Sequence, residues 1–212
     1  MKREGAQKMD LEKVIKERKA VRHYKENVTI PKSEIEELLR LSSQSPSGHN
    51  LQSWRVAVIT NNELREKIKP FAHDQEQVVT ASALLVFFAD THSAERLDDI
   101  YKQDVAEGFL PAEMLEAKIA DSHAYHATLT AQQLTENAII DTSLFAMHFM
   151  LLAKAKGYDT VPMRGFSADA IDALVETPAN YKPLLLMAIG KAEKEGYGTS
   201  RLAIDEFAEF IQ

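Results

Sequence analysis

Apolar residues gather in two unbroken runs of strand length, ALLVFFAD at 83–90 and PLLLMAIG at 183–190. Runs without polar alternation are typical of strands that are buried on both faces of a sheet. The segment 54–60, WRVAVIT, instead alternates large apolar residues with small or polar ones and meets two asparagines. It predicts a strand that ends in a turn, and a short extended piece at 159–166 raises the expected number of strands to three or four.

Helical spacing appears between these segments. Asp10 precedes a short amphipathic pattern that contains Val14, and Ser33 and Glu36 form a capping-box pattern at the start of a second helix. Apart from a predicted helix at 111–122, residues 92–128 are charged and irregular, which indicates an excursion from the core. Shorter helices are predicted at 62–71, 111–122, 166–175 and 205–211.

One helical pattern is much longer than the others and runs from about Thr130 to Lys156, with Gly157 placed to end it. Its apolar residues cover more than one face, so we expect a central, buried helix. These residues are Ile139, Ile140, Leu144, Phe145, Met147, Phe149, Met150, Leu151 and Leu152.

The order of these elements predicts a single α+β domain over residues 1–212. The chain opens with helices, its strands do not alternate regularly with helices, and it contains no G-x-G-x-x-G sequence and no P-loop. Nucleotide binding by those two devices is therefore excluded.

Composition narrows the class of protein. The formal net charge of -7 argues against a general nucleic-acid surface, and the absence of cysteine excludes disulfides and thiolate metal sites. The N-terminal MKREGAQKMD has no apolar core, so no secretory signal is expected. Polar residues such as Asp141 and His148 interrupt the apolar region 138–153, which argues against a membrane span. We expect a soluble, cytoplasmic protein.

No set of side chains looks like a catalytic centre that works alone. His123 and His126 suggest a metal pair only weakly, because no third ligand stands at a recognisable spacing. The serines near residue 47 are not in a G-x-S-x-G elbow. We therefore expect no metal and no catalytic side chain, as in enzymes whose cofactor carries the chemistry.

Four separated stretches, taken in order, resemble the FMN-dependent nitroreductases, over nearly the whole chain from about Val14 to Arg201. Each stretch alone has an ordinary explanation, such as a basic helix end or a turn-rich loop, but their joint order does not. The stretches are ERKAVRHY at 17–24, SPSGHNLQSW at 45–54, DTVPMRGF at 159–166 and GYGTSRLAIDEF at 196–207.

The resemblance implies an antiparallel sheet flanked by helices and an intertwined homodimer with one FMN in each of two interface pockets. It implies that Arg18, Arg201 and Lys19 bind the FMN phosphate. It also implies that Arg22 contacts the pyrimidine side of the flavin ring. The partner subunit's loop forms a wall of the pocket, and a segment within the extended piece 159–166 packs under the ring with backbone N–H groups toward N5 and O4. The loop residues are Pro46, Ser47, Gly48 and Asn50, and the segment residues are Pro162, Met163, Arg164 and Gly165.

Several positions depart from the family pattern or leave alternatives open. Ala20 stands where many relatives have Ser, and Thr199 stands where some have a basic residue. Asp74 and Gln77 fall where some members place an amide and a lysine at the ring edge. An aromatic lid over the substrate face within 92–128 is either Tyr125 or Phe109, unless both are core or surface aromatics.

The implied activity is hydride transfer from NADH or NADPH, through FMN, to a nitroaromatic or quinone-like acceptor in a ping-pong cycle. One alternative is a reductive dehalogenase or specialised dehydrogenase on the same scaffold. The other is a non-enzymatic protein that binds or senses FMN.

Overall fold

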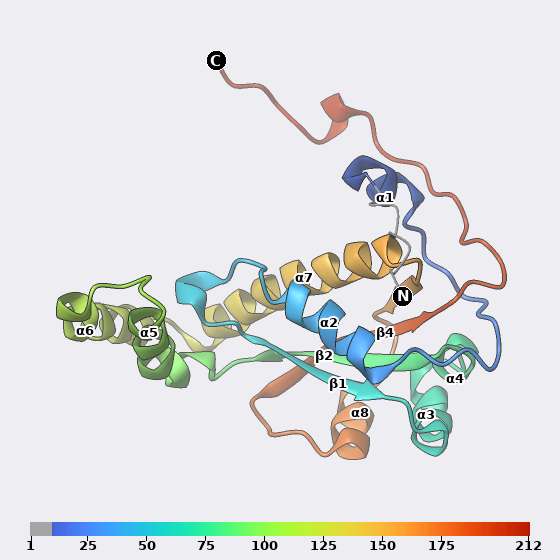
Figure 1. The fold of residues 1–212 in the computed structure, drawn as a ribbon, viewed down its shortest axis with the longest axis horizontal. Helices are drawn as coiled ribbons and strands as arrows, with labels where there is room; N and C mark the ends of the chain where they lie inside the picture. The colour runs from blue at the N-terminus through green and yellow to red at the C-terminus, as the bar shows by residue number, and fades with distance from the viewer. Residues whose placement is uncertain (1–9) are drawn as a thin grey trace, which may run out of the picture.

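The computed structural model describes residues 10–212, so most of the N-terminal segment inspected for a signal peptide lies outside the described residues. Four antiparallel strands form one sheet in the order β1-β2-β4-β3 (Figure 1). The central strand β2 is buried along its whole length, as its unbroken apolar run predicts. The strands are β1 (Trp54–Ile59), β2 (Ala83–Asp90), β3 (Asp159–Met163) and β4 (Tyr181–Gly190).

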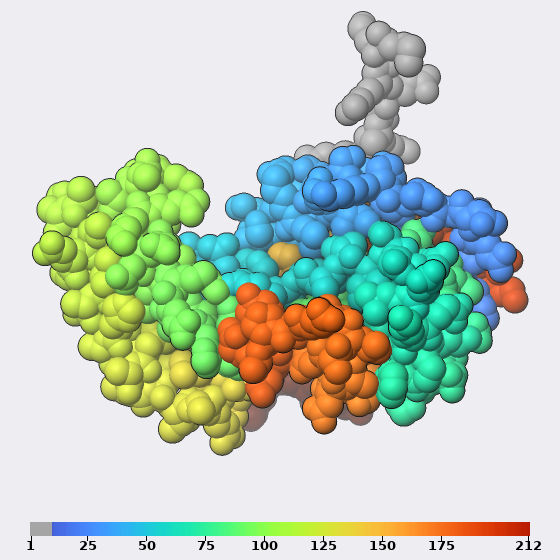
Figure 2. Space-filling view, turned by 90° about the horizontal axis from the view of Figure 1, so that it is seen from below, coloured from blue at the N-terminus to red at the C-terminus, as the bar shows by residue number. Residues whose placement is uncertain are grey.

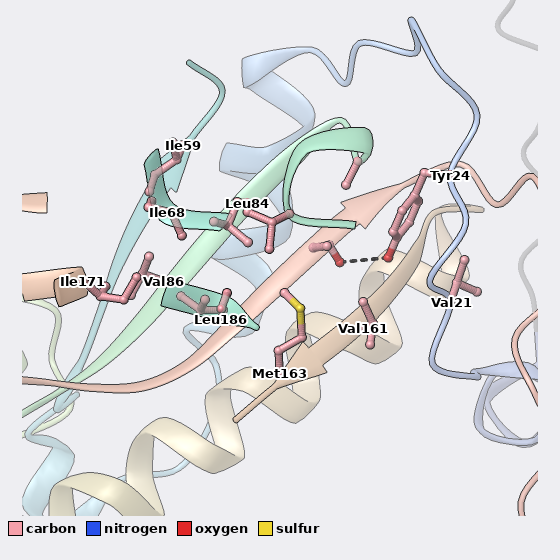
Figure 3. Packing of buried hydrophobic residues seen from close by; sticks show 14 of the residues in the cluster. Val21, Tyr24, Ile59, Ile68, Leu84, Val86, Val161, Met163, Ile171 and Leu186 are labelled. Carbon is pink, nitrogen blue, oxygen red and sulfur yellow. Dashed lines mark hydrogen bonds between the residues drawn. The ribbon is translucent and has the colours of Figure 1, made fainter. Parts of the chain in front are cut away.

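Helices cover both faces of this sheet, which confirms the predicted α+β class. On one face, α7 and α2 enclose a core in which Trp54 stacks on Phe145 with ring centroids 4.9 Å apart. On the other face, where α3, α4 and α8 lie, Ile68 of α3 and Ile171 of α8 belong to one core cluster with Val86 of β2 (Figure 3). The helices are α2 (Lys32–Ser42), α3 (Asn62–Ile68), α4 (Gln77–Thr80), α7 (Ala131–Ala155) and α8 (Ala168–Val175).

Residues 92–128 form a helical lobe that stands out at one end of the molecule (Figure 2). The lobe consists mainly of α5 (Leu97–Ala106) and α6 (Leu115–Ala127). The prediction of irregular structure was wrong for α5, and α6 begins and ends later than the predicted helix 111–122. The two helices pack against each other through a small core around Leu97 and Tyr101. Because this core needs few apolar residues, most of the other residues of the two helices are polar.

The base of the lobe is fixed to the sheet by Asp90, the last residue of β2. Its buried carboxylate lies 3.1 Å from the Arg55 guanidinium and 2.8 Å from that of Arg96, and it accepts a 2.7 Å hydrogen bond from Asn180. Burial opposes ionisation, yet these hydrogen bonds and charges hold the pKa of Asp90 below its usual range.

The long helix α7 is central but is buried on one side only in the single chain. Phe145 and Phe149 face the sheet, whereas Ile140, Leu144 and Met147 are 57%, 43% and 39% exposed. By length and composition alone, α7 could also cross a membrane, and 44% of its apolar window is buried inside the protein. The predicted long central helix is confirmed, and in a single chain its burial is limited to one side.

Two helix ends differ from their predictions. Helix α2 begins at Lys32 with Pro31 as its N-cap, so Ser33 lies inside the helix and does not cap it. The predicted terminal helix 205–211 is only a 3-10 turn, Ile204–Glu206, on an exposed C-terminal arm that begins near Tyr197 (Figure 1). By contrast, Thr130 and Gln133 form a complete capping box at the start of α7.

Candidate functional site

The basic segment 18–22 follows α1 (Leu11–Glu17) and is extended beside β3. Ala20 forms a parallel bridge with Thr160, and the Val21 N–H donates to the Thr160 carbonyl at 3.1 Å. Arg18 and Lys19 are half-buried there, while Arg22 is exposed. The backbone pairing therefore presents three cationic side chains at the start of β3.

Gly196 lies directly on this segment from the C-terminal side. A Cβ at this glycine would lie 2.7 Å from the Ala20 carbonyl oxygen and 2.8 Å from Lys19 Cβ. Beside it, Glu195 forms a 3.5 Å ion pair with Lys19. The close approach requires glycine, and it fixes the position of the basic segment against the chain that leaves β4.

The other end of β3 meets the turn that follows α3. The Gln77 amide donates to Met163 Sδ at 3.4 Å and to Gln75 Oε1 at 2.8 Å. The His73 ring lies so close to Gly165 that a Cβ there would meet His73 Cδ2 at 2.8 Å. Within residues 10–212, the N–H groups of Arg164 and Gly165 donate to no backbone carbonyl outside the strand ladder.

This arrangement assigns different roles to Gln77 and Asp74. Gln77 is 4% exposed and its amide is committed to Met163 and Gln75, so it supports the end of β3. Asp74 is exposed and, like His73, has a left-handed backbone. The predicted FMN contact of Gln77 stays a prediction.

The loop 46–52 is held in an unusual conformation beside the N-terminal half of α7. His49, Asn50 and Gln52 all have positive φ, between 49° and 55°. The Gly48 N–H donates to Asp141 Oδ1 at 3.2 Å, and the Ser53 hydroxyl donates to Asp141 Oδ2 at 2.8 Å. Burial raises the pKa of Asp141, while the bonds from Ser53 and Gly48 lower it again in part.

Within one chain, the loop and the basic segment lie toward opposite ends of α7 (Figure 1). The loop is anchored at Asp141, and the basic segment pairs with β3, which follows the end of α7 at Ala155. These two helix positions are 155 − 141 = 14 residues apart, which is about 21 Å along a helix. The two parts of the predicted pocket are therefore separated within one chain.

Arg201 lies on the exposed C-terminal arm and does not join the basic segment. Its guanidinium donates to its own neighbours, Thr199 Oγ1 and the carbonyl oxygen of Ser200. The predicted pairing of Arg18 and Arg201 around one phosphate stays a prediction.

The two histidines considered as a metal pair have separate partners. His123 Nε2 lies 2.7 Å from Asp98 Oδ1, and His126 Nε2 lies 3.1 Å from His49 Nδ1. Among the residues that the structure describes, no group of three or more metal-binding side chains is found.

Comparison with known proteins decides the family. The family model "Nitroreductase family" matches residues 15–191. This chain belongs to the nitroreductase family. YdgI of Bacillus subtilis, provisionally named an NAD(P)H nitroreductase, is 39% identical over 203 residues, which cover 95% of this chain and 97% of that protein.

Solved nitroreductase structures share the fold. A protein of Exiguobacterium sibiricum, provisionally named a nitroreductase and crystallised in complex with FMN, has a TM-score of 0.93 at 33% identity, with 96% of this chain and 98% of that chain covered. The CLA biosynthesis enone reductase of Lactiplantibacillus plantarum is 30% identical over 95% of this nitroreductase chain and 94% of its own length. The predicted family and fold are thus confirmed.

Proposed function

We propose that this protein is an FMN-dependent oxidoreductase that passes hydride from NADH or NADPH to a small organic acceptor in a ping-pong cycle. The observation that carries the proposal is the arrangement along β3. A cationic segment lies at one end of this strand, and its other end is followed by two backbone N–H groups that have no backbone acceptor within residues 10–212. The FMN complex of the Exiguobacterium relative and the name of YdgI support the choice of cofactor and electron donor.

The residues along β3 fit FMN by their chemistry. Guanidinium groups bind phosphate with several directed hydrogen bonds, and Arg18 and Lys19 supply a local positive charge in a chain whose net charge is -7. Backbone N–H groups at Arg164 and Gly165 match the acceptor atoms of a flavin edge. Ala20, which stands where many relatives have Ser, contributes no hydroxyl group to the proposed phosphate site.

When bound, FMN supplies a ring that takes up hydride from the nicotinamide and later delivers it. Arg18 and Lys19 would hold the phosphate, and Arg22 would place a positive charge beside the pyrimidine side of the ring, where it would favour hydride uptake. The N–H groups of Arg164 and Gly165 orient the reacting edge, with Pro162 and Met163 packed beneath. No side chain needs to act as an acid or base.

We infer that each pocket is completed by a second copy of the chain. Pro46, Ser47, Gly48 and Asn50 lie on a loop that is anchored about 21 Å along α7 from the helix end beside the basic segment of the same chain. The exposed apolar side of α7 and the apolar C-terminal arm provide a surface for the second copy. The arm also carries Arg201, which we assign to the phosphate.

The acceptor is proposed to be a nitroaromatic or quinone-like molecule, with the lobe 92–128 covering the substrate face. The 30% identity with an enone reductase favours a conjugated carbonyl compound as a second candidate. Since NAD(P)H is the donor, we propose that the enzyme works in the cytoplasm.

An absorption spectrum of the purified protein, followed by anaerobic titration with NADH and NADPH, tests this proposal. We expect a yellow protein that is bleached by one or both nucleotides and consumes them steadily only when a quinone, nitroaromatic or enone is added. The variant Arg18→Ala should lose FMN, while Arg40→Ala, at an exposed arginine paired with Glu37, should keep it. A colourless protein that takes up no FMN would contradict the proposal, and FMN without turnover would favour a binding or sensing protein.

A further inference from the structure

A cleft of about 300 Å³ lies where the loop 46–52, α6 and α7 meet. Its lining includes His49 from the loop, Tyr125 and His126 from α6, and Asn137 and Asp141 from α7. The three rings from the loop and α6 meet edge to face, with centroids 5.0 to 5.3 Å apart. The proposed function gives no role to this histidine pair.

The hydrogen bond between the two histidines and the surroundings of His126 together indicate which ring nitrogens carry protons. His126 Nε2 and His49 Nδ1 are 3.1 Å apart, so one of them donates and the other accepts. His126 Nδ1 is buried and has no hydrogen-bond partner among the described residues. An N–H in that position would be an unsatisfied donor, so the neutral ring with its proton on Nε2 is favoured, donating to His49.

We propose that His126 is a positioning residue for the loop 46–52, which it holds through a neutral hydrogen bond to His49, and that protonation of the pair releases the loop. This inference rests on the proposed function, in which the same loop walls the partner's FMN. His49 has a left-handed backbone, a conformation that persists only where neighbouring groups hold it. Asp141 holds the adjacent Gly48, so the loop is fixed from α7 on one side and from α6 on the other.

The groups around the pair determine the effect of pH. Burial, followed by the charges of His49 and His123, lowers the pKa of His126. Asp141 faces the same cleft from α7, but its carboxylate is already engaged by Gly48 and Ser53, and Asp98 of α5 is paired with His123. Because the lowered pKa of His126 means that the closed state binds fewer protons than the open one, the closed loop is stabilised above the ordinary histidine pKa, and this stabilisation is lost as the pH falls.

The rate of FMN release from the holoprotein, followed by flavin fluorescence between about pH 8 and about pH 5.5, tests the role of the pair. His126→Gln keeps an N–H donor but does not titrate, and His126→Phe keeps a ring without the hydrogen bond. We expect wild-type release to accelerate about tenfold more than release from His126→Gln over this range, the effect of one lost hydrogen bond. His126→Phe should release FMN rapidly already at the higher pH.

The phosphate of FMN titrates equally in all variants, so their differences report on the histidine pair. His92→Gln, at an exposed histidine that contacts Glu95, is the matched control and should behave as wild type. Equal rates and pH profiles for wild type and His126→Phe would overturn the inference, as would a His126→Gln protein that releases FMN as fast as His126→Phe at the higher pH.

Histidine ring NMR separates failure of this inference from failure of the proposed function. The His126 signal, assigned by its absence from His126→Phe, should titrate below the ordinary histidine range whether or not FMN is bound. A His126 that titrates in or above that range in a protein that still binds FMN overturns the inference alone. A protein that binds no FMN overturns the function, whatever the titration shows.

Discussion

Five of the seven non-glycine residues with left-handed backbone in residues 10–212 lie in two short segments, 49–52 and 73–74. A non-glycine residue in this region costs about 1–3 kcal/mol and persists only where the surroundings hold it. One segment belongs to the loop held by Asp141, and the other lies against Gly165 through the His73 ring. Both segments adjoin residues that we assign to the flavin pocket, so strain and proposed function coincide.

Substitutions at Asn50 distinguish the contribution of the loop's backbone conformation to FMN binding from that of the side chain. Its φ of 55° suits Asn and Gly but disfavours Ala. We expect Asn50→Ala to weaken FMN binding by about tenfold or more and Asn50→Gly to weaken it less, since only Ala adds backbone strain. Fluorescence titration of apoprotein with FMN measures both affinities. Wild-type affinity in Asn50→Ala would contradict the role of this residue.

At the scale of residues, the sequence predicts those site residues that lie in a recognisable short motif. Turn residues and a family resemblance pointed to the loop and to Arg18, Lys19 and Arg22. The supports of the loop were missed, because Gly48 and Asp141 are 93 positions apart and His49 and His126 are 77 apart. The only signal for Asp141 was an acidic residue inside an apolar helix, which we interpreted only as an argument against a membrane span.

The packing of the extended segment 18–22 against the chain after β4 gives a prediction at the scale of elements. In Gly196→Ala the new Cβ must push the backbone of Lys19 and Ala20 away, because it would lie 2.7 Å from the Ala20 carbonyl oxygen. We expect FMN affinity to fall about tenfold, through displacement of Arg18. Gly198→Ala is the matched control, since its Cβ would meet nothing within 4 Å. Equal losses in the two variants, or none in either, would contradict this account.

The junction of β2 with the lobe gives a second prediction at this scale. Removing the Asp90 charge leaves Arg55 and Arg96 without their partner, so Asp90→Asn should lower the free energy of unfolding by about 2 kcal/mol near neutral pH. Because the pKa of Asp90 is lowered in the folded protein, this contribution is present above the unfolded pKa and is lost as the pH falls below about 4. Urea unfolding at fixed protein concentration should show the two proteins converging in acid. A difference that persists unchanged in acid would contradict this assignment.

Helices and strands were predictable where their burial requires a distinctive pattern of apolar residues. The unbroken apolar runs became β2 and β4, and the long apolar pattern became α7. Helix α5 was missed because it buries only a narrow strip around Leu97 and Tyr101 and is otherwise polar. Ser33 was misassigned as a cap because Pro31, which has a fixed φ and lacks an N–H, takes the N-cap position two residues earlier.

For the whole molecule, the exposed side of α7 predicts association of two copies. Ile140, Leu144 and Met147 form an apolar stripe that a partner would bury. We expect Leu144→Asp to shift the protein toward monomer and to reduce FMN binding with it, whereas Lys67→Glu, which also adds a carboxylate to an exposed helix position, should leave both unchanged. Analytical ultracentrifugation with flavin absorbance measures both. A Leu144→Asp monomer that keeps its FMN would contradict the shared pocket.

The central claim is that each FMN pocket takes its basic segment from one chain and its loop from the other. The most direct test is a mixed dimer of one Arg18→Ala chain and one Asn50→Ala chain, isolated with two different affinity tags and titrated with FMN. If the loop acts across the dimer, both substitutions fall in the same pocket and the other pocket is fully wild type, so half of the sites should bind FMN with wild-type affinity. If every pocket of the mixed dimer is weakened and no site has wild-type affinity, the loop serves its own chain and the account is wrong.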